Sequence, residues 1–438
     1  MSRTSFVGGL LAVALYAFAL LSIGLTRDWK LLHEDNGAIH TTFALSHLRL
    51  GLARTRAHDL FFDPRTGQSA IYGHHPPATA LALAGAFALT GSDSVAVARM
   101  VPIFFHLGSL VLFAILLRRL FSPGWALFGA FLVATLPMSS YFGRVVNYEP
   151  LCLFAVLIQL SGWARFRQSG SRAALGWLAF GVVLGGLIDW PSFFFAGAIA
   201  IAEAIDLAGN RLRPVAPLLV VVVSASVVLL FDLWHLWYAG HGSLAALRDV
   251  LARKLPGGAK GVSFPRFAST QFETFRRYFT HAGLLSSIAV AAALARPRGR
   301  LFRALFAIPD PETTTRLLAA SGGAALAYVL AAPWWSSTHA YWQFHFLPFV
   351  VVSMILVCRF LAKEASPGRR LGARVLLALY LVEVVVTSGY VLRIRHRKVG
   401  AFAVQKTLEY RARYLVPESL KPTSETGPTP PWEPDLPR

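Results

Sequence analysis

Long apolar stretches alternate with short polar ones along most of the chain. Eleven stretches are predicted to be membrane-crossing helices, each of which needs about 20 mainly apolar residues: 6–25, 99–117, 125–142, 150–164, 174–188, 191–207, 215–234, 278–295, 317–333, 344–362 and 373–392. The first lacks a small-residue cleavage site and is interpreted as a retained span. A twelfth stretch, 77–91, is only about 15 residues long, which suits a helix lying at the membrane interface. The pattern predicts an all-α polytopic membrane protein.

The lysines and arginines of the short loops predict the orientation, because cytoplasmic loops are enriched in these residues. One set of alternating loops carries fifteen of them, whereas the other set carries only Arg144. We therefore expect about eleven spans, a cytoplasmic N-terminus and an outer C-terminus, with 77–91 on the outer surface. A twelve-span arrangement would place the basic residues of 393–398 inside but break the loop pattern. The fifteen residues are Arg118, Arg119, Arg165, Arg167, Arg172, Arg211, Arg213, Arg296, Arg298, Arg300, Arg303, Lys363, Arg369, Arg370 and Arg374.

Composition agrees with a membrane protein and excludes several other classes. Only 15% of the 438 residues are charged, yet the formal net charge is +20, from 42 Lys and Arg against 22 Asp and Glu. These figures exclude an ordinary cytosolic enzyme, a disordered chain and a disulfide scaffold. Cys152 and Cys358 lie in apolar stretches and are interpreted as small buried hydrophobic residues. The basic excess is assigned to anionic membrane lipids and not to nucleic acid.

Polar residues collect at the predicted outer level of the membrane, where two long segments, 26–98 and 235–276, also lie. A polar, Pro-rich tail follows at 396–438. Polar groups are costly in a membrane and therefore informative. The alternatives are an interfacial belt for the aromatic residues, a helix cap for Asp189 and a solvated loop for the acidic pair. The outer set comprises Glu34, Asp35, Tyr72, His74, His75, Arg144, Glu149, Asp189, His235, His339, Tyr341 and Gln343.

A cluster of this kind is suited to moving a group from a phosphate to an alcohol. A carboxylate at the outer mouth can act as a general base toward a hydroxyl, and arginine and histidine can hold a phosphate. Two histidines with a glutamate could bind a divalent ion. In an inverting displacement, one carboxylate activates the acceptor on the face opposite the leaving group. The apolar body of the protein suggests a lipid-borne substrate.

The order of these motifs resembles that of a known family. Glu34-Asp35 follows the first span, and an amphipathic segment at 38–52 and the motif Tyr-x-x-His-Pro-Pro at 72–77 come next. Gly-Arg-x-x-Asn-x-Glu-Pro occupies 143–150, and His-x-Tyr-x-Gln occupies 339–343. Over residues 1–395 the chain resembles the GT-C superfamily of polyprenyl-phosphate-dependent membrane glycosyltransferases. The branch it resembles most is that of the protein mannosyltransferases and aminoarabinose transferases.

The resemblance implies a GT-C fold, a polyprenyl-phosphate-linked sugar donor, an outward-facing active site and inversion at the sugar. The general base falls on Asp35, or on Glu34 as the alternative, because the order Glu-Asp reverses the usual acidic pair. The second acidic position falls on Glu149. A divalent metal ion is implied at His74, with His235 or His241 as partner. The donor phosphate and sugar are assigned to Arg144, His339, Tyr341, Gln343, His75 and Tyr72.

Other functions stay open from the sequence. A transporter or flippase for polyprenyl-linked lipids would need polar groups along its path, and the spans carry few charges. A non-catalytic assembly subunit would have no need of the carboxylates. The sequence names neither the sugar nor the acceptor, which can be a lipid, a glycan or a protein, and we expect acceptor recognition around 248–275 and in the tail. The high Arg and Ala content favours a bacterial protein of the inner (plasma) membrane, with its active site facing the periplasm.

Overall fold

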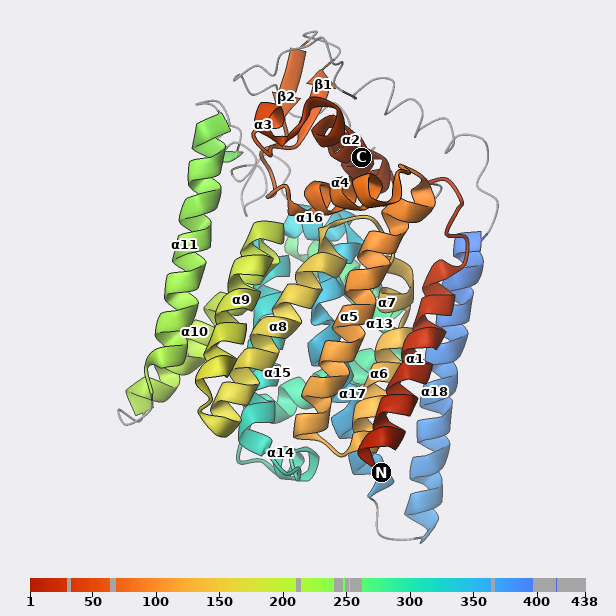
Figure 1. Ribbon diagram of the computed structural model, residues 1–438. Helices are drawn as coiled ribbons and strands as arrows, with labels where there is room; N and C mark the ends of the chain where they lie inside the picture. Colours follow the sequence, from red (N-terminus) through yellow and green to blue (C-terminus); the bar gives the residue numbers. More distant parts are fainter. Residues whose placement is uncertain are drawn as a thin grey trace.

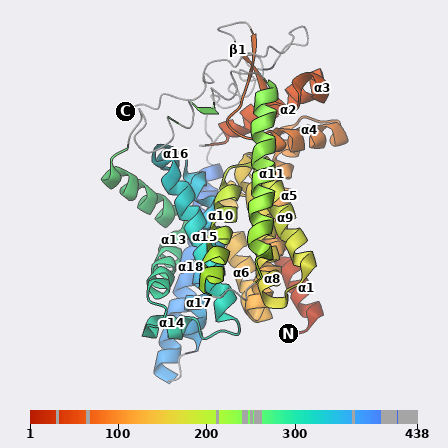
Figure 2. The ribbon, with the colours of Figure 1, turned by 90° about the vertical axis from the view of Figure 1, so that its left-hand side faces the viewer.

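A bundle of helices, crossed at one end by a layer of short elements, makes up the chain (Figures 1 and 2). The computed structural model describes residues 1–29, 33–63, 68–209, 214–239, 247–248, 252, 262–363, 367–396 and 415. Its elements in chain order are α1 (Arg3–Ser22), α2 (Asp35–Leu50), α3 (Leu52–Thr55), β1 (Leu60–Asp63), β2 (Gln68–Ile71), α4 (Ala78–Thr90), α5 (Val95–Leu120), α6 (Pro123–Thr135), α7 (Pro137–Phe142), α8 (Tyr148–Ser169), α9 (Arg172–Ile188), α10 (Pro191–Gly209), α11 (Ala216–Ala239), α13 (Phe264–Ala295), α14 (Arg300–Leu305), α15 (Pro311–Ala331), α16 (Pro333–Thr338), the 3₁₀ helix η1 (Ala340–Phe346), α17 (Leu347–Ala362) and α18 (Pro367–His396).

The two ends of the bundle differ in what they carry. One end, here called the loop end, carries α2, α3, α4 and the β1–β2 ribbon, and α4 lies across the long helices instead of alongside them (Figure 1). The opposite end, here called the far end, carries α14 and the connections after α5, α8 and α17 (Figure 1). The basic loops predicted to be cytoplasmic, where the structure describes them, all lie at the far end. The alternation expected from the loop charges is therefore present in the fold.

Within the described residues, seven helical segments are long and apolar enough to cross a membrane: Arg3–Ser22, Val95–Leu120, Pro191–Gly209, Ala216–Tyr238, Phe264–Ala295, Ala340–Ala362 and Arg370–Tyr390. Three apolar helices, α4, α6 and α9, are shorter. Every one of the eleven predicted spans coincides with helical structure. The all-α polytopic fold is therefore confirmed, and the number of crossings stays a prediction.

The structure departs from the predicted elements in four places. Pro137 separates α6 from α7 within the expected span 125–142, because proline lacks an N–H and its ring clashes with the preceding turn. The expected span 344–362 begins as the 3₁₀ helix η1, and α13 begins well before 278 and is kinked at Thr280, where φ is 67°. The sequence prediction had no strands, but β1 and β2 pair antiparallel. His241 and nearly all of the tail lie outside the described residues.

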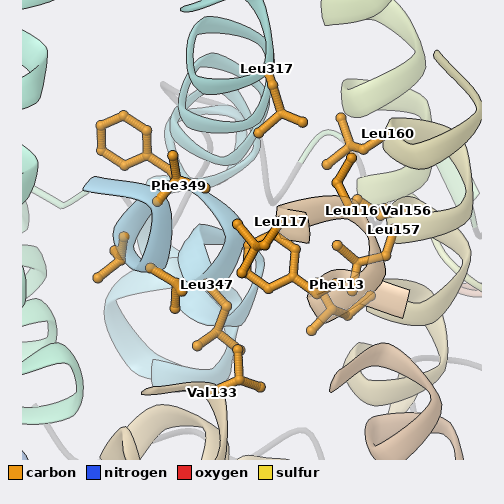
Figure 3. Close-up of a cluster of buried hydrophobic side chains, with 14 of the residues drawn as sticks. Phe113, Leu116, Leu117, Val133, Val156, Leu157, Leu160, Leu317, Leu347 and Phe349 are labelled. Carbon is orange, nitrogen blue, oxygen red and sulfur yellow. The ribbon is translucent and has the colours of Figure 1, made fainter. Parts of the chain in front are cut away.

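Apolar side chains from five helices fill the centre of the bundle. Figure 3 shows them approaching one another from α5, α6, α8, α15 and α17. Close packing of α8 against α9 depends on small residues: a Cβ on Gly162 would lie 2.6 Å from the backbone N of Leu178, and one on Gly181 would lie 2.6 Å from that of Gln159. Small residues allow such close approach between membrane helices. The labelled side chains are Phe113, Leu116, Leu117, Val133, Val156, Leu157, Leu160, Leu317, Leu347 and Phe349.

A buried ion network joins three helices at the far end. The guanidinium of Arg167, on α8, lies 2.7 Å from Glu203 Oε1 and 2.8 Å from Asp206 Oδ2, both on α10. Its Nη2 also lies 2.8 Å from Glu312 Oε1, in the first turn of α15. Arg316 of α15 pairs with Asp206 as well. The Arg167 side chain is only 5% exposed, so its charge depends on these carboxylates for compensation.

Candidate active site

Glu34 lies between two arginines at the loop end. It immediately precedes α2, and its side chain is 4% exposed. Its Oε2 lies 3.2 Å from Nη2 of Arg99, on α5, and its Oε1 lies 3.5 Å from Nη2 of Arg144, in the connection between α7 and α8. A buried carboxylate needs such partners because an unpaired charge is costly to remove from water. These three residues, here called the loop-end triad, tie together segments that are far apart in the sequence.

Both arginines also hold the chain at the end of α1. Arg99 donates to the carbonyl oxygens of Gly24 and Leu25, at 3.3 and 3.0 Å. Arg144 donates to that of Leu21 at 3.3 Å. The last carbonyls of a helix have no partner within it, so a guanidinium is a suitable donor there. Burial, and secondarily Arg99, lowers the pKa of Arg144 to about 10, which leaves it charged at neutral pH. The predicted contact of Arg144 with a donor phosphate stays a prediction.

Asp35 is the first residue of α2 and differs from Glu34 in its surroundings. Glu34 is buried and paired with two arginines, whereas Asp35 is half-buried. Its position at a helix N-terminus favours a negative charge, because the free N–H groups and the helix dipole point toward it. The next residue, Asn36, is hydrogen-bonded to Tyr341 in η1. The start of α2 is therefore attached to a second element of the candidate site.

Glu149, the second predicted carboxylate, lies in the first turn of α8 and is 3% exposed. Its side chain is hydrogen-bonded to Asn147. The two predicted carboxylates thus come from different elements, Asp35 from the start of α2 and Glu149 from the start of α8.

His33 belongs to a group of ring side chains, here called the aromatic wall, that also includes Phe142, His339 and Tyr341. Its backbone is in the left-handed region, with φ at 68°, which is uncommon for a residue with a side chain. Its ring centroid lies 4.9 Å from that of Tyr341, 5.5 Å from that of His339 and 6.2 Å from that of Phe142. Burial, and secondarily the neighbouring His339, lowers the pKa of His33 to about 3. His33 is therefore neutral at physiological pH.

His339 and Gln343, two of the residues assigned to the donor, also make contacts within the protein. His339 Nδ1 lies 2.8 Å from Thr338 Oγ1 and 3.1 Å from the carbonyl oxygen of Trp335, on whose ring the imidazole stacks. Gln343 Nε2 donates to Gln271 Oε1 of α13 at 2.7 Å. These contacts place both residues in the wall around η1, and their role toward a donor stays a prediction.

His75 and Tyr72 form a second aromatic group with Tyr148. The His75 ring stacks on that of Tyr148, with 4.3 Å between centroids, and lies nearly parallel to Tyr72 at 6.2 Å. His75 Nδ1 lies 2.7 Å from Oδ1 of Asp189. Asp189 is the C-cap residue of α9, and the same oxygen accepts the backbone N–H of Trp190 at 2.8 Å. Asp189 therefore combines the predicted position at a helix end with orientation of a predicted site residue.

The two predicted metal ligands have different neighbours. The carbonyl oxygen of His74 accepts a hydrogen bond from Trp190 Nε1 at 2.7 Å. The His235 ring stacks on His58 with 3.7 Å between centroids, and its Nε2 donates to the carbonyl oxygen of Arg56 at 2.8 Å. In the part of the chain that the structure describes, no group of three or more His, Cys, Asp or Glu side chains is arranged to hold a metal ion. Metal binding at His74 and His235 stays a prediction.

Sequence reasoning missed two residues that organise the site. Sequence reasoning placed Arg99 only at the start of a span. An arginine within an apolar helix is costly in a membrane and needs a partner, so Arg99 itself was a signal for a buried ion pair. His40 of α2, whose Nε2 lies 3.2 Å from Asn147 Oδ1, had no such signal because it sits in an ordinary amphipathic segment. Burial lowers the pKa of His40 to about 4.

One family model matches part of the chain. The sequence model of the family described as dolichyl-phosphate-mannose-protein mannosyltransferase matches residues 74–237, from the His74-His75 motif through most of α11. No curated protein sequence matches the chain significantly.

Solved structures share the fold of the whole chain. The oligosaccharyltransferase of Archaeoglobus fulgidus in its apo form matches with a TM-score of 0.59 and 13% identity, over 98% of this chain and 62% of that one. The same enzyme, AglB, with an inhibitory peptide and a dolichol-phosphate also gives 0.59 at 13% identity, over 97% and 61%. ArnT from Cupriavidus metallidurans bound to undecaprenyl phosphate gives 0.55 at 11% identity, over 94% and 77%.

The class of protein follows from these likenesses. The chain is an integral membrane protein with the GT-C fold, and the resemblance to the GT-C superfamily predicted from its motifs is confirmed. The chain spans 61–62% of the length of the archaeal oligosaccharyltransferase.

Proposed function

We propose that the protein transfers a sugar from a polyprenyl-phosphate donor to an acceptor hydroxyl at the loop end of the bundle. The observation that carries the proposal is the position of Asp35: a half-buried carboxylate that directly follows Glu34 of the loop-end triad, at the start of a helix whose next residue, Asn36, is hydrogen-bonded to Tyr341. The GT-C fold and the mannosyltransferase family model support the same class of reaction. Structures of AglB and ArnT contain dolichol-phosphate and undecaprenyl phosphate, which are polyprenyl-type phosphates.

Asp35 is the proposed general base. Glu34 already accepts hydrogen bonds from two guanidinium groups, and taking a proton would weaken both pairs. Asp35 has greater access to solvent and begins a helix held in place by those pairs. It would remove the proton of the acceptor hydroxyl while the acceptor oxygen bonds to the anomeric carbon and the sugar–phosphate bond breaks. Attack opposite the departing phosphate inverts the anomeric carbon.

The donor is proposed to lie along the wall made by η1 and the chain before α4. Negative charge develops on the departing phosphate, so stabilising that charge is the largest electrostatic task of such a site. Arg144, His339, Tyr341 and Gln343 are the proposed phosphate-side residues. Tyr72 and His75 are proposed to contact the sugar, and Glu149 to orient it.

The loop end is proposed to face the periplasm of a bacterial inner membrane. This orientation follows from the basic loops at the far end, which we expect to be cytoplasmic. Under this arrangement α4 lies on the outer surface and does not cross the membrane. A single cysteine introduced at Gly91, at the end of α4, should react with a membrane-impermeant maleimide added from the outside.

Replacing Asp35 by Asn tests the base. The variant keeps the shape of the side chain but cannot take a proton, and turnover should fall by about 10²–10⁴. The measurement is the release of undecaprenyl phosphate, by mass spectrometry, from a panel of undecaprenyl-phosphate-linked monosaccharides by the full-length protein in bacterial membranes, which supply lipid, glycan and protein acceptors. Asp93→Asn, the same substitution at an exposed acid of the loop end, is the control and should keep full activity. Full activity of Asp35→Asn would reject the base, and no release from any donor by the unmodified protein would reject the function.

A further inference from the structure

The first part of α13 turns one of its sides away from the protein. These residues, 264–279, are here called the arm, and they lean away from the bundle near the loop end (Figure 2). The part of α13 that follows the kink at Thr280 coincides with the predicted membrane span 278–295. The arm therefore lies where a span reaches the membrane surface on the loop-end side.

The kink between the arm and the span is stabilised by two helix caps. Thr280 leaves the helical conformation, with φ at 67°, and its Oγ1 accepts the N–H of Gly283 at 3.3 Å. The carboxylate of Glu383, on α18, accepts the N–H groups of His281 and Ala282 at 2.9 and 3.1 Å. The first N–H groups of a helix need acceptors of this kind. The span thus begins as a new helix, and the inclination of the arm belongs to the fold.

The inner side of the arm is attached to η1 and α16. Gln271 Oε1 accepts a hydrogen bond from Gln343 Nε2 at 2.7 Å, and Gln271 Nε2 donates to Ser336 Oγ at 3.4 Å. One turn further on, the ring of Phe275 packs on that of Phe346, with 5.6 Å between centroids. Residues four apart share one face of a helix, so these contacts fix the rotation of the arm about its own axis.

With this rotation, an apolar strip of the arm is exposed. Phe264, Ala268 and Phe272 are four residues apart and thus follow one line along the helix. Phe264 is 75% exposed and Phe272 is 54% exposed. Helices that lie in the membrane surface carry phenylalanine on one side and arginine on the other, and they bury the apolar side at the boundary between headgroups and acyl chains. The strip is therefore suited to that boundary.

Basic side chains lie beside the apolar strip. The arm carries three arginines, Arg266, Arg276 and Arg277, against a single acid, Glu273, which gives it a net charge of +2. Glu273 accepts hydrogen bonds from Arg276 and Arg277, whose side chains stay partly exposed. One carboxylate cannot neutralise three guanidinium groups, so the exposed side of the arm is positive. An anionic membrane surface attracts such residues, because lipid phosphates accept their hydrogen bonds.

We propose that the arm lies in the membrane surface on the loop-end side and binds anionic phospholipids there. Its two exposed phenylalanines lie among the upper acyl chains, and its three arginines lie at the phosphates. The arm continues directly into a predicted span, which favours lipid over a protein partner. Its inner side holds Gln343, so one helix joins the lipid surface to the candidate site. Lipid binding by the arm needs no transfer reaction and is independent of the proposed function.

Spin labels on the full-length protein test the depth of the arm. Ala268→Cys places a nitroxide on the apolar strip, and Ser269→Cys places one on the polar side. The native Cys152 and Cys358 are buried and do not compete for the label. In nanodiscs of phosphatidylcholine with phosphatidylglycerol, the label at 268 should collide more often with oxygen, which dissolves in lipid, than with a water-soluble nickel complex. The label at 269 should show the opposite preference.

Removing charge tests the choice of lipid. The double substitution Arg266→Gln and Arg277→Gln should raise the access of the nickel complex to the label at 268 about threefold in discs with phosphatidylglycerol, because the attraction to anionic headgroups is weaker. In discs of phosphatidylcholine alone it should change nothing. Arg303→Gln, at an exposed arginine of α14 at the far end, is the control and should leave the label at 268 unchanged.

Two results would overturn the proposal. Equal access of the nickel complex to 268 and 269 in every disc would mean that the arm lies in water and that its apolar strip serves another partner. Equal depth of the label at 268 with and without phosphatidylglycerol would exclude anionic phospholipids as the ligand. That comparison of lipids uses the native arginines, so it decides the question even if the double variant does not fold.

Discussion

The two ends of the bundle bury charge in opposite arrangements. At the loop end one carboxylate, Glu34, lies between two arginines, whereas at the far end one arginine, Arg167, lies among three carboxylates. The far-end partners all lie on regular helices, α8, α10 and α15. The loop-end partners hold irregular chain, namely the start of α2 and the carbonyl oxygens at the end of α1.

This difference indicates different roles for similar interactions. Helices α8, α10 and α15 are already positioned by their apolar packing, so the far-end network adds mainly to stability. Residues 23–29 and 33–34 lie between α1 and α2, and the loop-end triad contacts this connection directly before Asp35 and Asn36. We therefore expect substitutions at the far end to lower the free energy of unfolding and substitutions at the loop end to lower turnover.

The largest expected effect is that of Arg167→Met at the far end. Removing one partner from a buried network leaves an opposite charge uncompensated, here that of Glu203, since Asp206 keeps Arg316, and costs about 3–5 kcal/mol. The free energy of unfolding, measured by titrating the detergent-solubilised protein with SDS, should fall by that amount. Turnover per folded molecule should stay unchanged.

The matched control is Arg277→Met on α13. Arg277 pairs with Glu273, and its side chain is 62% exposed, so its removal should cost less than about 1 kcal/mol. A drop in turnover of folded Arg167→Met would contradict the division of roles between the two ends.

Glu34→Gln has the next largest expected effect. Glutamine keeps the shape of the Glu34 side chain and one acceptor oxygen, so the free energy of unfolding should fall less than in Arg167→Met. Arg99 and Arg144, however, lose their anionic partner. We expect the positive charges of Arg99 and Arg144 then to attract the carboxylate of Asp35. Turnover should fall about 10–100-fold, and a tenfold fall corresponds to about 1.4 kcal/mol of activation free energy. The undecaprenyl phosphate release assay measures this. Glu312→Gln, the same substitution in the far-end network, should leave turnover unchanged. If Glu312→Gln lowered turnover and Glu34→Gln did not, the roles assigned to the two ends would be exchanged.

The helices and the grouping of polar residues could be predicted from the sequence, whereas their pairing could not. Apolar length and loop charge are local properties. They indicated eleven apolar stretches, all of which coincide with helical structure, and the loop end as the polar level. The partners are a property of tertiary packing: Arg99 is 65 residues from Glu34, and no spacing links them. The pairing of Arg144 with Glu34 and the stacking of His235 on His58 were likewise not predicted, whereas the roles of Arg144 toward a phosphate and of His235 toward a metal stay predictions. The four-residue strands β1 and β2 were missed because so short a pattern does not stand out in a long polar loop.

The smallest expected effect is that of pH on the free energy of local opening at the loop end. It tests whether the loop end opens independently of the far end. Burial lowers the pKa of His33 to about 3, with His339 as a second cause, and burial lowers that of His40 to about 4. In water the pKa of histidine is about 6.5. When the loop end opens, these rings can take up protons between pH 6.5 and 4, so the open state binds more protons and acid favours opening. Both histidines lie at or near α2, and the far-end network contains no histidine among its described members.

Lowering the pH from 7 to 6 should therefore weaken the loop end selectively. The free energy of opening should fall by about 0.7 kcal/mol for each histidine, which is about a threefold rise in the open population. Hydrogen exchange, corrected for its intrinsic pH dependence, should show faster exchange in peptides from α2 and no change in peptides from α10. Equal acceleration at both ends would mean that the bundle opens as one unit, and the loop end would then have no independent mobility with which to admit a substrate.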